Sequence, residues 1–167
     1  MNMSQLSFRK KSCIKVLALL TFACLIVASS FAQPRGIKWS KDGNSYFRVE
    51  KNEMVQYTLP ANEPNVIISK DLFVPEGDSI PLKYNFFAFS DDDQKLLLFT
   101  NTKRVWRLNT KGDYWVLDRQ QGTLKQLGKS LPPSSLMFAK FSPDGNFVAY
   151  VCENNIYVED LATSQIR

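Results

Sequence analysis

The sequence contains no histidine, and this absence excludes several kinds of chemistry within the chain. A Ser-His-Asp or Cys-His catalytic unit cannot form, nor can a metal site built on imidazole ligands. Cysteine is scarce as well: Cys13 and Cys24 fall in an apolar N-terminal segment, which leaves Cys152 alone in the rest of the chain. One thiol forms neither an internal disulfide nor a zinc site. Because Cys152 lies in the apolar run 147–152, we expect a buried strand residue rather than a nucleophile. We expect no catalytic residue, no metal and no cofactor in this chain.

Acidic residues are missing from the first 32 residues, which carry four of the 21 Lys and Arg residues. Without these four, seventeen cations face sixteen acids, so the remainder does not predict nucleic-acid binding. The segment has the pattern of a secretory signal, with cations at 9–11, an apolar run at 16–28 and a small-x-small site at 30–32. The run is shorter than the roughly 20 apolar residues of a membrane-spanning helix. We therefore predict a signal peptide over residues 1–32 and an exported protein, periplasmic or associated with the cell envelope. The alternative is an uncleaved N-terminal anchor, which would be the chain's only contact with a membrane.

Residues 33–167 show no apolar stripe of helical period. They contain short β-branched, aromatic or alternating runs, such as 45–49, 95–100 and 113–117, and Gly or Asp-Gly turn signals separate these runs. The pattern predicts an all-β fold. Two polar tracts, 59–64 and 74–78, are interpreted as surface loops between repeating units.

One motif occurs three times in this part of the chain. An aromatic residue followed by Ser-x-Asp begins at Trp39, Phe89 and Phe141, which are 50 and then 52 residues apart. A period near 50 residues is typical of β-propellers, in which each repeat forms one four-stranded blade. A closed propeller needs about four to eight blades of roughly 40–50 residues, so residues 33–167 predict a partial β-propeller of two and a half to three blades. We expect the N-terminal part of a larger protein, with the fourth strand of the third repeat and its turn beyond Arg167.

The second repeat is longer than the third. Phe89 and Asp118 are 29 residues apart, whereas Phe141 and the equivalent Asp160 are 19 residues apart, which places ten extra residues within 101–112. Insertions in repeat arrays often fall on the binding face, although a longer hairpin that packs against a neighbour fits the spacing equally well. The acidic run Asp91–Asp93 lacks the ligand spacing of a calcium loop and occupies the turn of the repeated motif, so we expect a turn there.

Three stretches carry a resemblance to a known family. The sequence resembles the dipeptidyl peptidase IV family of the prolyl oligopeptidase clan, above all its exported bacterial members, in segments 105–118, 136–145 and 155–161. The most specific of these pieces is Trp106-Arg107 ahead of the Asp113-Tyr114 strand, because Ser-Pro-Asp-Gly and Asn-Ile-Tyr-Val occur in many propellers.

The resemblance implies a fold and an activity for the parent protein. Members of this family place an eight-bladed propeller over an α/β-hydrolase domain, form homodimers, and remove dipeptides whose second residue is proline or alanine from peptide substrates. The resemblance also implies that Arg107 holds a backbone carbonyl of the substrate. From the residues alone, Arg107 is equally a solvated charge or a salt-bridge partner, and Trp106, Tyr114 and Trp115 pack between strands more readily than they stack on a ligand.

The departures from the family are informative. The chain contains no Glu-Glu pair and no Gly-x-Ser-x-Gly nucleophile elbow, and Ser134-Ser135 is interpreted as a loop. One hypothesis is therefore the N-terminal propeller portion of a serine dipeptidyl peptidase, with the α/β-hydrolase domain absent from this segment. The other is a non-catalytic envelope propeller that binds a protein or peptide.

Overall fold

The first repeat forms a four-stranded antiparallel sheet. The structure is a computed structural model that describes residues 37–167, so the predicted signal peptide lies outside the described residues. The sheet has the order β1–β2–β3–β4, and each strand pairs with the next along the chain. Its strands are β1 (Lys38–Trp39), β2 (Ser45–Glu50), β3 (Glu53–Thr58) and β4 (Glu63–Ile68).

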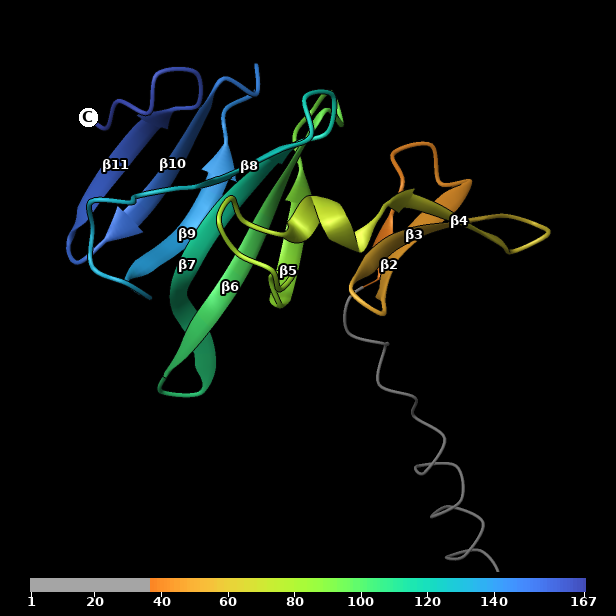
Figure 1. Ribbon diagram of the computed structural model, residues 1–167, viewed down its shortest axis with the longest axis horizontal. Coiled ribbons are helices and arrows are strands. Elements are labelled where there is room, and N and C mark those ends of the chain that lie inside the picture. The colour runs from red at the N-terminus through yellow and green to blue at the C-terminus, as the bar shows by residue number, and fades with distance from the viewer. Residues whose placement is uncertain (1–36) are drawn as a thin grey trace, which may run out of the picture. The chain divides into compact units, whose positions relative to one another are not determined.

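The second and third repeats follow the same up-and-down order. A short 3-10 helix, η1 (Lys70–Phe73), leads from the first repeat to the second. The second repeat contains β5 (Tyr84–Phe89), β6 (Lys95–Val105), β7 (Leu108–Asp118) and β8 (Thr123–Gln126), and the third contains β9 (Leu136–Phe141), β10 (Phe147–Cys152) and β11 (Asn155–Asp160). Figure 1 shows the three groups of strands. A single pair of cross-strand partners, Gly112 on β7 and Leu136 on β9, joins the second group to the third. The all-β fold predicted from the sequence is confirmed.

Two details differ from the sequence predictions. The tract 59–64 does not separate repeats, because it forms the turn between β3 and β4 and its last two residues already belong to β4. The turn after β11, expected beyond Arg167, lies within the chain, where Ile166 forms an isolated antiparallel bridge with Glu159. The first difference arose because proline and polar residues marked 59–64 as a loop, whereas pairing with the preceding strand decides the conformation of residues 63–64.

The repeated motif builds the same turn three times. Ser40, Ser90 and Ser142 each donate a hydrogen bond through Oγ to the Asp two residues later, at 2.5 Å in all three copies. The same Asp accepts a hydrogen bond from the backbone N–H two residues further on, at 3.0–3.1 Å. These bonds lower the pKa of Asp42, Asp92 and Asp144, because they favour the charged carboxylate. The acidic run Asp91–Asp93 is therefore a turn, as predicted.

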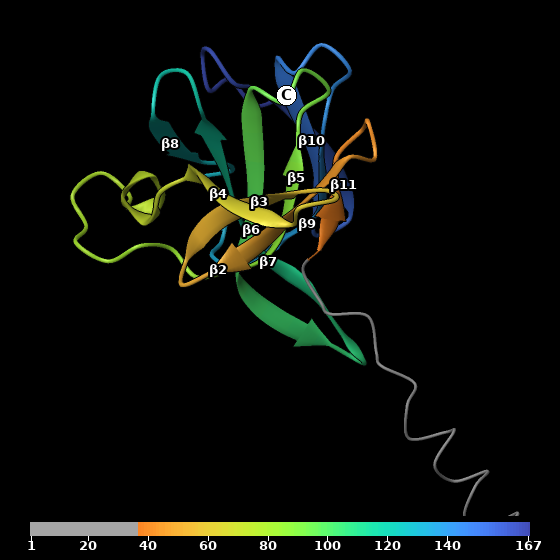
Figure 2. The ribbon, with the colours of Figure 1, turned by 90° about the vertical axis from the view of Figure 1, so that its right-hand side faces the viewer.

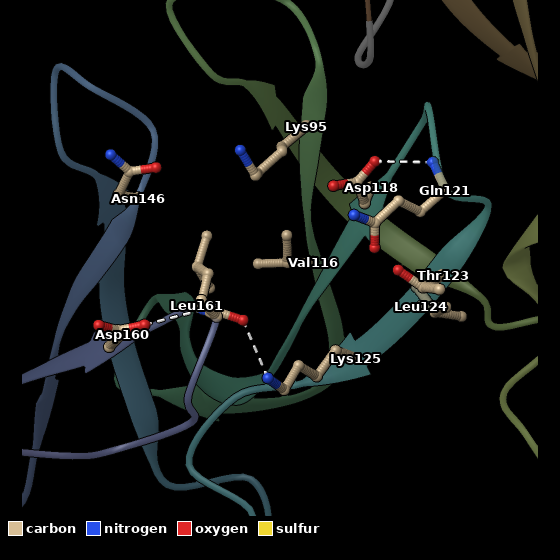
Figure 3. A pocket seen from close by; sticks show the side chains of 11 residues that line it. Lys95, Val116, Asp118, Gln121, Thr123, Leu124, Lys125, Asn146, Asp160 and Leu161 are labelled. Atoms are coloured by element: carbon tan, nitrogen blue, oxygen red, sulfur yellow. Dashed lines mark hydrogen bonds between the residues drawn. The ribbon is translucent and has the colours of Figure 1, made fainter.

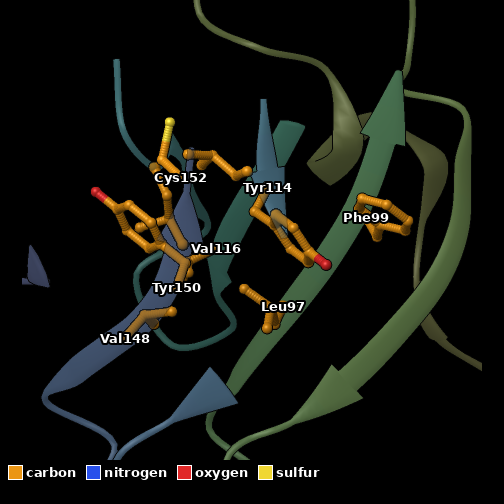
Figure 4. Packing of buried hydrophobic residues seen from close by; sticks show 9 residues of the cluster. Leu97, Phe99, Tyr114, Val116, Val148, Tyr150 and Cys152 are labelled. Carbon is orange, nitrogen blue, oxygen red and sulfur yellow. The ribbon is translucent and has the colours of Figure 1, made fainter. Parts of the chain in front are cut away.

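The second repeat is packed on both faces of its sheet. Alternate residues of β6 enter two separate clusters: Leu96 and Leu98 pack with Met54 and Ile68 of the first repeat, whereas Leu97 packs toward the third repeat. Figure 4 shows Leu97 near side chains of the third repeat. Burial of both faces explains the continuous apolar run in β6, where a sheet with one wet face would alternate. The cluster toward the third repeat includes Phe99, Tyr114, Val116, Val148, Tyr150 and Cys152.

One charged group is buried in the third repeat. The carboxylate of Glu159 is 3% exposed and accepts hydrogen bonds from the Tyr150 hydroxyl at 2.9 Å and from the Gly128 backbone N–H at 2.8 Å. The second bond ties β11 to the connection between β8 and β9. Burial, followed by the neighbouring Glu159 carboxylate, raises the pKa of the Tyr150 hydroxyl, which therefore stays protonated and donates.

Candidate functional site

A long hairpin extends the second repeat. β6 and β7 contain 11 residues each, whereas the corresponding β10 and β11 contain six, and the pairing continues to Val105 with Leu108. The ten extra residues therefore form a hairpin rather than an irregular loop. Figure 2 shows this hairpin, which we call the arm (residues 101–112), projecting beyond the other strands of the second repeat.

The two residues singled out by the sequence form the tip of the arm. Trp106 and Arg107 are the turn between the paired residues Val105 and Leu108. The Trp106 side chain is 93% exposed, and its backbone has a φ of +60°, a conformation that costs a residue with a bulky side chain roughly 1–2 kcal/mol. Arg104 steadies the turn, because its Nε donates a hydrogen bond to the Trp106 carbonyl at 3.1 Å.

Arg107 is exposed to solvent at this tip. Within residues 37–167 a single ion pair is found, between Arg48 and Glu50 at 3.4 Å, so the interpretation of Arg107 as a salt-bridge partner finds no support there. The tip does not pack on a neighbour in this part of the chain, since Trp106 and Leu108 are both exposed. The structure thus leaves the Arg107 guanidinium available for an external group.

The base of the arm is held firmly to the third repeat. One oxygen of the Asp113 carboxylate accepts a hydrogen bond from the Asn101 side-chain amide at 2.7 Å, and the other accepts one from the Ser134 backbone N–H at 2.6 Å. The buried Ser134 hydroxyl completes the ring by donating to the Asn101 carbonyl at 2.8 Å. Close packing adds to this: a Cβ on Gly112 would lie 2.4 Å from the Phe99 ring, so only glycine fits. The arm therefore rises from a fixed base.

The other aromatic residues of the motif have structural roles. Tyr114 is buried and stacks on Phe99 with ring centroids 4.6 Å apart, and burial raises the pKa of its hydroxyl. Trp115 is half-buried against the cluster shared with the first repeat. The expectation of strand packing holds for these two residues and fails for Trp106, because its place at the hairpin tip leaves nothing to pack against.

The remaining candidates do not form a second chemical centre in the described residues. Cys152 is buried in β10, as expected, with its sulfur 3.3 Å from the Ser135 hydroxyl. Ser134 and Ser135 lie in the loop before β9. Among residues 37–167, no cluster of three or more acidic or thiol side chains could hold a metal ion. No helix in the same range has both the length and the apolar character needed to cross a membrane.

A hollow between the second and third repeats was not predicted from the sequence. This hollow, of about 760 Å³, lies between the β7–β8 hairpin and the turn after β11 (Figure 3). Its two carboxylates are engaged in hydrogen bonds within turns. Asp118 accepts a hydrogen bond from the Gln121 backbone N–H, and Asp160 accepts hydrogen bonds from the backbone N–H groups of the turn that follows it. Lys125 donates to the Leu161 carbonyl across the hollow at 3.0 Å. Residues from different repeats build it, so no local sequence signal marks it.

Together, the three successive antiparallel repeats and the arm define a segment of a β-propeller. Comparison with known proteins shows which family this part of the chain resembles. Residues 90–167 match the family described as the dipeptidyl peptidase IV (DPP IV) N-terminal region. In these residues the chain is similar to the N-terminal region of the dipeptidyl peptidase IV family.

Two relatives are similar in sequence, and a solved structure is similar in fold. A probable dipeptidyl-aminopeptidase B of Aspergillus clavatus is 33% identical over 104 residues, which cover 62% of this chain and 10% of that protein. Dipeptidyl aminopeptidase B of Saccharomyces cerevisiae is 25% identical over 147 residues, covering 80% of this chain and 17% of that protein. The crystal structure of Porphyromonas gingivalis dipeptidyl peptidase 4 superposes with a TM-score of 0.68 at 22% identity, covering 83% of this chain and 20% of that chain. The chain thus spans a small part of the length of the proteins it matches.

Proposed function

We propose that the chain is the propeller portion of an exported serine dipeptidyl peptidase that removes N-terminal X-Pro or X-Ala dipeptides. In this proposal the segment positions the peptide and supplies none of the catalytic groups. The family match supports the class of enzyme, and the absence of histidine supports the division of labour, because a serine triad needs an imidazole base. An envelope location and a homodimeric parent protein belong to the same proposal.

One observation carries the role of Arg107: its guanidinium lies at the exposed tip of an arm whose base is fixed by Asp113. A guanidinium stays protonated and presents several donors in a planar fork, so it can hold a carbonyl oxygen in one place. Holding the substrate before the reaction reduces the entropic cost of reaching the transition state. The rigid base matters because a mobile arm would have to become ordered when the substrate binds, and this ordering would restore the entropic cost.

The test is the substitution Arg107→Ala in the protein expressed from its complete reading frame. With a Gly-Pro chromogenic substrate, we expect kcat/KM to fall about 10- to 100-fold, as for the loss of one hydrogen bond to a charged group. Arg48→Ala is the matched control, because Arg48 is an exposed arginine on β2, outside the arm. Circular dichroism checks that both variants fold.

Each outcome separates the hypotheses. An unchanged kcat/KM in Arg107→Ala would reject the substrate role, and an unmodified protein without dipeptidyl peptidase activity would reject the enzyme. In the second case, the exposed tryptophan at the arm tip favours the other hypothesis, a non-catalytic envelope propeller that binds a protein or peptide.

A further inference from the structure

The arm has an uncompensated positive charge. Residues 101–112 contain four cations, Lys103, Arg104, Arg107 and Lys111, and no acid. The carboxylate that follows them in the chain, Asp113, has both oxygens engaged at the base of the arm, by Asn101 and Ser134. None of the four cations forms an ion pair with another residue of 37–167.

Strand pairing places two of these cations against each other. Lys103 on β6 and Lys111 on β7 are cross-strand partners in the hairpin. Like charges directly opposite one another destabilise a two-stranded ribbon. The register shifts on both sides of Lys103, so the strands bend locally and still leave the two lysines paired. Lys111 is half-buried and Lys103 is exposed. Within the described chain, neither lysine forms an ion pair that would offset this repulsion.

We propose that the Lys103–Lys111 pair binds carboxylate side chains of a peptide, so that the arm selects acidic peptides. This inference rests on the proposed function, of which it specifies the substrate class. A carboxylate placed near both ammonium groups would turn their mutual repulsion into two attractions. Charge complementarity therefore commits the occupant to an anionic peptide, and the exposed Trp106 ring offers an apolar surface for the peptide's neighbouring side chains.

An anionic membrane is the competing occupant. An interfacial segment needs a broad apolar face as well as cations. The exposed large apolar side chains of the arm are Trp106 and Leu108, both next to the turn. So narrow an apolar surface favours a peptide.

The binding experiment compares two labelled peptides that differ in charge alone. The probes are Gly-Pro-Glu-Glu-Gly and Gly-Pro-Gln-Gln-Gly with a C-terminal fluorophore, and fluorescence anisotropy measures Kd for the full chain. We expect the acidic peptide to bind about three- to tenfold more tightly in low salt, the range that a few exposed charge pairs provide. At about 0.5 M NaCl the ratio should approach one, because salt screens the attraction between exposed charges of the peptide and of the arm.

Variants of the pair locate the effect. The double variant Lys103→Gln/Lys111→Gln should lose the preference, Lys103→Arg/Lys111→Arg should keep it, and Lys103→Glu/Lys111→Glu should reverse it. Lys70→Gln/Lys129→Gln removes the same charge from two exposed lysines outside the arm and should keep the preference. Since the glutamine pair removes a repulsion, we expect this variant to fold with an unchanged or higher Tm.

A kinetic comparison separates failure of this inference from failure of the proposed function. If both peptides are cleaved and the glutamine pair leaves their kcat/KM ratio unchanged, the selection of acidic peptides is wrong and the proposed dipeptidyl peptidase function stands. If neither peptide is cleaved, the proposed function is wrong, and the inference falls with it. Binding to phosphatidylserine vesicles that outweighs any peptide preference would also overturn the inference.

Discussion

At the residue scale, the position directly after the aspartate of the repeated turn shows how backbone geometry selects a side chain. Gly43 and Gly145 have φ values of +71° and +67° at this position, and the second copy has Asp93 at +57°. Glycine adopts this left-handed region without steric cost, whereas other residues are strained there. Asp93 is therefore the strained member of an otherwise identical set.

We predict that Asp93→Gly stabilises the protein by about 1 kcal/mol, because the strain is removed while the turn's hydrogen bonds remain. The bond from Arg119 to this turn survives, since its acceptor is the Asp93 backbone carbonyl. Urea unfolding measures the gain. Asp91→Gly, two residues earlier, is the control and should lower or leave unchanged the free energy of unfolding, and an equal gain there would contradict the strain argument.

The three turn carboxylates also predict a dependence on pH. Their hydrogen bonds place the pKa of Asp42, Asp92 and Asp144 below the ordinary value of 3.8. A lowered pKa in the folded state means that the stabilisation is complete above pH 3.8 and is lost as the pH falls further, through the folded-state pKa values. We expect the urea midpoint to decline below about pH 4. The triple Asp→Asn variant should show a weaker decline, and an identical decline would assign acid sensitivity to other groups.

At the scale of the element, the arm is long, exposed and cationic, and yet it remains a paired hairpin. Its cohesion comes from the base, where the Asp113 carboxylate joins Asn101 of β6 to the loop residue Ser134. The substrate role proposed for Arg107 depends on this junction, because the base of the arm fixes the orientation of its tip.

We predict that Asp113→Ala destabilises the protein by roughly 2 kcal/mol, since it removes two charge-assisted hydrogen bonds and leaves the Ser134 N–H without a partner. The substitution should accelerate hydrogen exchange in residues 101–112 more than it does in β10. Asp78→Ala changes an exposed carboxylate in the connection between the first two repeats and serves as the control. If the arm stays fully protected in Asp113→Ala, the junction is not what holds it.

At the scale of the whole molecule, the repeats stabilise one another through the two faces of β6. Leu98 is fully buried against the first repeat, and its neighbour Leu97, 1% exposed, is buried against the third. Repeat architectures of this kind have stability shared between intrinsic terms and nearest-neighbour interfaces. Two adjacent leucines thus report on two different interfaces.

We predict that Leu98→Ala and Leu97→Ala each cost about 3 kcal/mol, as do other leucine-to-alanine changes in packed cores. Their patterns of amide exchange should differ: Leu98→Ala should loosen β2–β4, and Leu97→Ala should loosen β9–β11. The two variants are each other's control. The same exchange pattern in both would show that the repeats unfold as one unit.

The sequence by itself determined the elements and their repetition. Alternating apolar runs, the Ser-x-Asp turn and the fifty-residue period are local patterns, and a local pattern needs no knowledge of distant contacts. The position of the ten extra residues and the burial of Cys152 also followed from contiguous stretches of chain, whereas Arg107 was singled out by the resemblance to a known family.

Tertiary structure alone decided the features that join distant segments. The register that pairs Lys103 with Lys111, the junction of Asp113 with Ser134, and the strand character of residues 63–64 depend on which partner each strand meets. Trp106 is exposed because it lies at the tip of a hairpin that extends beyond the neighbouring strands, whereas Tyr114 in the same motif is buried. Composition treats these two aromatic residues alike, because burial is a property of the surroundings and not of the side chain.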